Sequence, residues 1–101
     1  MAKWDYSAAS DSARRFANLA EAAALLDYAM ALVDEAGQGS LAGGLLHESM
    51  EAWALAEQTA EGLTAEDVRV LLDALEAGEL GGDMDDQAAE ILRARGMDVA
   101  L

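Results

Sequence analysis

Two adjacent apolar stripes run along the stretch from Phe16 to Ala36. Within each stripe the residues recur at steps of 3 and 4, which places them on one side of a helix. The first stripe is Phe16, Leu19, Ala23, Leu26, Met30 and Val33, and the second is Ala22, Leu25, Ala29, Leu32 and Ala36. Because a helix with two apolar stripes contacts more than one neighbour, the pattern predicts the central helix of a small bundle.

Capping signals set the bounds of this helix and of the next one. The favourable N-cap residues are Ser10, Asp11 and Ser12, and Gly37 is a natural C-terminal stop. The first helix is therefore predicted over about residues 10–36. A second helix is predicted over residues 41–61. The loop between them is short, and we therefore expect the two helices to be antiparallel neighbours.

The second predicted helix has one apolar side and two glycines near its beginning. Gly43 and Gly44 either allow a close approach to the first helix or loosen the helix end. Its apolar side is predicted to consist of Leu45, Leu46, Met50, Trp53, Ala56 and Ala60.

The most specific local signal marks the beginning of a third helix, predicted over residues 65–77. Thr64 and Asp67 have the spacing of a capping box, although Asp is shorter than the usual Glu at the third position. Leu63 and Val68 stand at the two positions of a hydrophobic staple. The residues that this helix is predicted to bury are Val68, Leu71, Leu72 and Leu75.

A fourth helix is predicted over residues 84–95, followed by a tail over residues 97–101. Carboxylates favour the positive end of the helix dipole, and those at its beginning are Asp83, Asp85 and Asp86. Gly96 is predicted to end the helix in a Schellman cap, with Met97 contacting Leu92.

Composition supports an all-α fold. The 101 residues include 24 alanines, five aromatic residues, no Pro and no Cys. Alanine is the best helix former, and the absence of Cys excludes disulfides and Cys-ligated zinc. We predict a compact single-domain bundle of four helices over residues 1–101, with two long antiparallel helices, two shorter ones and an N-terminal arm over residues 1–9. Trp4 and Tyr6 of this arm either cover the core or contact a partner.

Net charge is the strongest deviation from an ordinary composition. Twenty acidic residues against six basic ones give −14, and no Lys or Arg occurs from Phe16 to Val68. Such a charge repels nucleic acid and anionic membranes and attracts basic proteins. The alternative is that the carboxylates only keep the surface solvated.

The sequence gives no sign of a targeting or membrane-spanning segment. No apolar stretch typical of a signal peptide follows Lys3. The longest apolar run, from Ala22 to Val33, is interrupted by Asp27 and is shorter than the roughly 18 residues that a spanning helix needs. A cytoplasmic location without membrane contact is therefore expected.

Candidate chemistry is sparse, and we predict neither an enzyme nor a bound cofactor or metal. His47 and Glu51 stand at i and i+4, which is part of the H-E-x-x-H zinc motif without its second histidine. A metal-dependent activity at His47 is kept as a minor alternative, and a polar pair on a solvated helix is preferred. The acidic stretch from Asp83 lacks the Gly and Glu that a calcium loop needs, because Ala88 and Ala94 occupy those positions.

These features leave two classes of function. The first is a protein-binding module, most concretely an inhibitor that presents an acidic helical surface to a basic, nucleic-acid-handling protein. The composition resembles that of small acidic phage proteins, including anti-restriction and anti-CRISPR inhibitors, which act as nucleic-acid mimics; the likeness is one of composition and identifies no family. The predicted partner-binding residues are Glu48, Glu51, Glu57, Glu61, Asp83, Asp85, Asp86, Trp4 and Tyr6. The second class is a structural protein that associates with itself as a homodimer.

Overall fold

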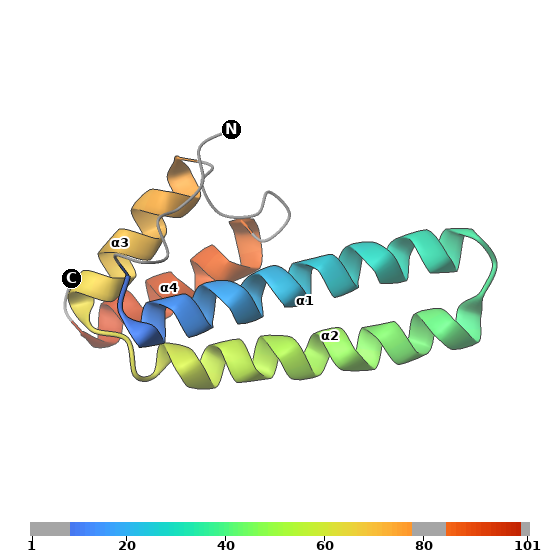
Figure 1. Cartoon of the computed structure of the whole chain (residues 1–101), viewed down its shortest axis with the longest axis horizontal. Coiled ribbons are helices and arrows are strands. Elements are labelled where there is room, and N and C mark those ends of the chain that lie inside the picture. The colour runs from blue at the N-terminus through green and yellow to red at the C-terminus, as the bar shows by residue number, and fades with distance from the viewer. Residues whose placement is uncertain (1–8, 78–84, 100–101) are drawn as a thin grey trace.

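Helices are the only regular secondary structure in the described part of the chain. A computed structural model describes residues 9–77 and 85–99, and these residues contain no β-strand. The helices are α1 (Asp11–Glu35), α2 (Gly39–Ala60), α3 (Ala65–Glu76) and α4 (Asp85–Asp98) (Figure 1). The predicted all-α fold with two long and two shorter helices is confirmed.

The two long helices form an antiparallel hairpin, and the two short helices lie beside one end of it (Figure 1). This end contains the beginning of α1 and the end of α2. At 1.5 Å per residue, α1 with its 25 residues is about 37 Å long, whereas α4 with 14 residues is about 21 Å long. The short helices therefore leave the other end, which we call the distal hairpin (residues 25–50), without a helical layer on it in the described part of the chain.

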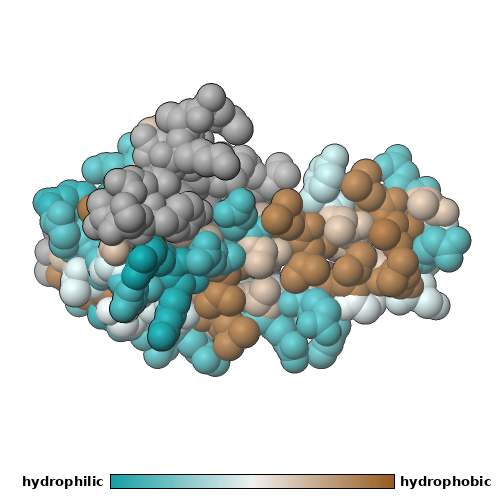
Figure 2. All heavy atoms as spheres, in the orientation of Figure 1, coloured by the Kyte–Doolittle hydropathy of each residue, from teal (hydrophilic) through white to brown (hydrophobic). Residues whose placement is uncertain are grey.

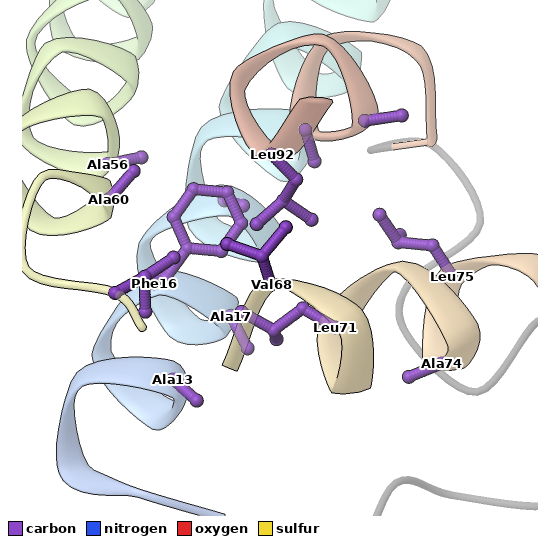
Figure 3. Packing of buried hydrophobic residues seen from close by; sticks show 14 of the residues in the cluster. Ala13, Phe16, Ala17, Ala56, Ala60, Val68, Leu71, Ala74, Leu75 and Leu92 are labelled. Carbon is purple, nitrogen blue, oxygen red and sulfur yellow. The ribbon is translucent and has the colours of Figure 1, made fainter. Parts of the chain in front are cut away.

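The core lies where all four helices meet. Phe16 of α1 is its largest fully buried side chain, and it points toward Val68 and Leu92 of the short helices (Figure 3). Leu63 is also fully buried, so both predicted staple residues belong to the core. The part of α1 that faces the core carries mostly alanines, namely Ala13, Ala17, Ala20, Ala23 and Ala24. Their small side chains allow the neighbouring helices to approach α1 closely.

Helix α1 contacts both α2 and α3, as predicted for a central helix, but its second predicted stripe is not buried. Leu25 and Leu32 of that stripe are 59% and 52% exposed. On α2, Leu46 and Met50 are 44% and 63% exposed, which corrects the predicted apolar side of that helix. The reason is the same in both cases: these residues lie on the distal hairpin, where neither short helix covers them.

Of the three predicted N-cap candidates for α1, the structure selects Ser10, and it confirms the capping box of α3. The Ser10 side chain accepts a hydrogen bond from the backbone N–H of Ala13 (3.1 Å), and Gly37 ends the first hairpin helix with a positive φ of 83°. Thr64 and Asp67 form both hydrogen bonds of the capping box, each 3.1 Å long. These contacts join residues at most four positions apart, which explains why sequence alone could predict them.

Helix α2 begins two residues earlier than predicted and continues through Gly43 and Gly44. A Cβ atom added at either glycine would meet no atom within 4 Å. A close approach of the two backbones is therefore not the reason for these glycines.

Helix α4 does not end at Gly96, and the predicted Schellman cap is wrong. The helix continues to Asp98, and Met97 is 81% exposed, too far out for the predicted contact with Leu92. Gly96 is buried within the last turn. Arg95 fixes this turn, because its Nε donates a hydrogen bond to the carbonyl oxygen of Leu63 (3.0 Å). Tertiary packing thus outweighs the cost of about 1 kcal/mol for glycine in a helix interior.

By length and composition, α1 is the one helix in the described residues that would suffice to cross a membrane. In its most apolar 18-residue window, which has a mean hydropathy of 1.4, only 28% of the residues are buried. Core helices of water-soluble proteins are as long and as apolar, although they are mostly buried, and the expected cytoplasmic location stays a prediction.

Candidate functional site

The four glutamates that were predicted to form one acidic surface on α2 are all exposed, but they lie on two sides of the helix. Glu48 and Glu57 are nine residues apart, which is about two and a half helical turns, so they point in nearly opposite directions. Glu61 lies one turn beyond Glu57 on the same side, and Glu51 lies near Glu48. The helix thus carries two separate pairs of carboxylates.

Glu48 and Glu51 lie on the side of α2 that we call the outer side. The candidate metal ligand His47 lies next to Glu51. His47 Nε2 lies 3.6 Å from Glu51 Oε1, and both side chains are well exposed. No group of three or more His, Cys, Asp or Glu side chains suited to a metal occurs in the described residues. The geometry is that of a polar i,i+4 pair on a solvated helix face.

Most of the remaining predicted partner-binding residues lie outside the residues that the structure describes. Trp4, Tyr6 and Asp83 lie outside the described residues, as does the side chain of Asp85, the first residue of α4. Asp86 is exposed and lines a hollow of about 290 Å³ between α3 and α4.

A groove between α2 and α4 combines carboxylates with an apolar floor. It consists of two adjoining hollows, each of about 380 Å³, which share Glu57 and Gln87. We call it the α2–α4 groove. One hollow is lined by Glu57, Ala60, Glu61, Gln87, Glu90, Ile91, Ala94, Arg95 and Asp98. The other is lined by Asp27, Leu46, Ser49, Met50, Trp53, Ala54, Glu57 and Gln87.

Negative charge dominates the hollow at the end of α4. Four carboxylates line it, those of Glu57, Glu61, Glu90 and Asp98, and all four residues are exposed. The single cation in its lining is Arg95, which is half-buried and bonded to a backbone carbonyl. The ion pairs of the described residues are Arg14–Asp11, Arg69–Glu66 and His47–Glu51. None of them neutralises a carboxylate of this hollow, so its rim can receive cations from another molecule.

The other hollow is lined by apolar and polar residues in equal number, and it includes a hydrogen bond between the two long helices. Trp53 Nε1 donates to Asp27 Oδ2 (3.0 Å), and the indole is only 6% exposed. This bond fixes the wall that Trp53 forms. Leu46 and Met50 lie one to two turns away along α2, where their exposed side chains can be covered by a ligand.

Apolar residues also gather elsewhere on the distal hairpin. Figure 2 shows hydrophobic side chains over the part of the hairpin that extends beyond α3 and α4. Its large exposed apolar residues are Leu25, Tyr28, Leu32, Leu41, Leu46 and Met50. Leu41 and Met50 are nine residues apart and point in nearly opposite directions, so the six residues do not form one patch. Apolar side chains that gather as in Figure 2 are typical of a region that contacts another macromolecule.

The sequence predictions missed most of the groove, including two of the four carboxylates in the hollow at the end of α4. Glu57 and Glu61 were predicted, whereas Glu90, Asp98 and Met50 were not. The spacing of Gln87, Glu90, Ala94 and Asp98 by 3 and 4 residues indicates one side of a helix, but not which neighbour that side meets.

No family model, no curated protein and no solved structure matches this chain. The function must therefore be argued from the site itself.

Proposed function

We propose that this protein is a small acidic protein-binding module that binds a basic protein through its exposed carboxylates. In its most concrete form it is an antagonist that occupies the nucleic-acid-binding surface of that partner, with its carboxylates in place of phosphates. Arg and Lys side chains that hold phosphates form similar charge-assisted hydrogen bonds with carboxylates.

The observation that carries this proposal is the set of carboxylates in the α2–α4 groove. Glu57, Glu61, Glu90 and Asp98 line one hollow, and no ion pair within the described residues neutralises them. A surface with a solvating role alone would not need acidic side chains gathered around a concave apolar floor. The net charge of −14 adds long-range attraction that speeds association with a basic partner.

Affinity capture followed by competition tests this function. The immobilised protein is exposed to a nuclease-treated lysate of the organism that carries the gene and is washed at low and high salt. We expect a basic nucleic-acid-binding protein that elutes at high salt, because screening weakens exposed charge contacts. The soluble protein should then displace nucleic acid from that purified partner.

A charge-reversed variant decides whether the carboxylates cause the binding. This variant combines four substitutions: Glu48→Lys, Glu51→Lys, Glu57→Lys and Glu61→Lys. All four side chains are exposed, so circular dichroism should show an unchanged fold. Capture and displacement should both be lost. Retention of the partner by this variant, or a partner that does not bind nucleic acid, would show that the antagonist function is wrong.

The exposed apolar residues of the distal hairpin favour a second candidate, a homodimer with a structural role. Leu25 and Leu32 are each more than half exposed, and a second copy could cover them. Light scattering over a dilution series tests this candidate. A monomer at every concentration would exclude it, whereas a dimer that Leu25→Ser and Leu32→Ser dissociate would support it.

A further inference from the structure

The α2–α4 groove changes in character along its length. At one end Leu46 and Met50 lie beside Trp53, whose indole N–H is bonded to the Asp27 carboxylate. Glu61 and Asp98 form the acidic end, with Glu57 where the two hollows meet. From Leu46 to Glu61 the groove follows 15 residues of α2, a length of about 22 Å. A second helix of about four turns would span this distance.

Resting on the proposed function, we infer that the α2–α4 groove binds a basic amphipathic helix of the partner protein. The apolar residues of that helix cover Leu46, Met50 and Ile91. Its Lys and Arg side chains meet Glu57 and Glu61 on one wall of the groove. On the opposite wall they meet Glu90 and Asp98 of α4.

The shape of the site favours a helix as the occupant. The described residues contain no β-strand, so an extended peptide would find no sheet edge with which to pair its backbone. A groove between two packed helices instead accepts the side-chain ridge of a third helix.

Charge distinguishes a basic partner from a second copy of this chain. A second copy carries the same net charge of −14 and would add carboxylates to a groove that already holds five. Like charges brought together at an interface oppose binding, whereas a cationic helix gains attraction along the acidic end. The groove therefore selects against self-association at this site.

Synthetic peptides of 15 residues provide the probe. One is an amphipathic Leu/Lys helix, the second is a scrambled sequence of the same composition without an apolar face, and the third has Glu in place of every Lys. Fluorescence anisotropy of the labelled peptide measures affinity. In a Trp4→Phe background Trp53 is the remaining tryptophan, and its emission reports whether the hollow beside it is occupied. We expect the amphipathic cationic peptide to bind and to change the Trp53 emission.

Two double variants with equal charge test the location. Glu57→Gln with Glu61→Gln neutralises two groove carboxylates, and Glu48→Gln with Glu51→Gln neutralises two carboxylates on the outer side of the same helix. Binding of the cationic peptide should weaken about tenfold in the groove variant and by less than about twofold in the outer variant. A third variant, Leu46→Ser with Met50→Ser, should weaken binding about tenfold without changing its salt dependence, because no charge is altered.

Three results would overturn the inference. If peptide binding weakened equally in the two glutamine variants, the overall negative charge of the protein would attract the peptide, and the groove would not be its binding site. Equal binding of the scrambled peptide would exclude a helix-specific site. A dimer of the free protein that Leu46→Ser with Met50→Ser dissociates would show that a second copy occupies the groove. Each of these leaves the captured basic partner in place, whereas failure of capture and displacement would remove the proposed function itself.

Discussion

Ser10 donates a hydrogen bond from its Oγ to Oδ1 of Asp67, at 2.8 Å and across 57 residues of sequence. The same hydroxyl accepts the backbone N–H of Ala13 in the first turn of α1. The other carboxylate oxygen of Asp67 accepts the backbone N–H of Thr64. One carboxylate thus joins the beginnings of α1 and α3, so the local cap of each helix also fixes the position of the other.

Removal of this carboxylate should cost more than an ordinary surface substitution. We expect Asp67→Ala to lower the free energy of unfolding by about 1–2 kcal/mol, because it removes a cap and a contact between helices. For a chain of this size the melting temperature should fall by roughly 5–10 °C. Thermal unfolding followed by circular dichroism measures the effect.

Glu66→Ala is the matched control, since Glu66 lies beside Asp67 in the first turn of α3 and pairs with Arg69 on the surface. An exposed pair of this kind contributes at most about 1 kcal/mol, and we expect a loss below about 0.5 kcal/mol. Equal destabilisation by the two substitutions would contradict a joint role of Asp67 in both caps.

Short-range signals explain most of what the sequence predicts about the fold. The capping box at Thr64 and the stop at Gly37 involve residues within one helical turn, and both are present as expected. Which side of α1 is covered depends instead on where α3 and α4 pack. The covered side carries alanines such as Ala17 and Ala20, whose small apolar surface gives a weaker sequence signal than Leu25 and Leu32.

The candidate site is harder to predict from the sequence than the fold, because residues of two different helices form it. The helical repeat by itself places Glu48 and Glu57 on opposite sides of α2. The division of the four glutamates into two pairs could therefore have been predicted from the sequence. The contribution of Glu90 and Asp98 depends on the contact between α2 and α4, which no local pattern indicates.

The hydrogen bond from Trp53 to Asp27 should contribute measurably to stability. Asp27→Ala leaves a nearly buried indole N–H without its acceptor, and we expect a loss of about 1–2 kcal/mol. Asp27→Asn retains an acceptor oxygen and should lose less than half as much. Urea unfolding followed by Trp fluorescence compares the two. If both variants unfolded at the wild-type urea concentration, the bond would have no net stabilising effect.

The glycines of the hairpin should respond in opposite ways to alanine. Gly43→Ala and Gly44→Ala place a methyl group in open space within a helix, and each should raise the free energy of unfolding by about 0.5–1 kcal/mol. Gly37→Ala forces a side chain into a backbone conformation with φ of 83°, and should lower it by about 1 kcal/mol. Thermal unfolding of the three variants checks the signs. A loss of stability at Gly43 or Gly44 would indicate that the hairpin needs a loose helix end there.

The distal hairpin should tolerate polar substitutions that the core does not. Leu32 is 52% exposed, so we expect Leu32→Ser to change the free energy of unfolding by less than about 1 kcal/mol. Leu71 is fully buried in the same core cluster as Phe16 and Val68, and Leu71→Ala should cost about 2–5 kcal/mol. Urea unfolding at two protein concentrations separates the effect of packing from that of association. A large loss in Leu32→Ser that grows with protein concentration would mean that a second copy covers the hairpin. A large loss independent of concentration would mean that a segment of the same chain covers it. The expected small change leaves this apolar surface free for a different partner.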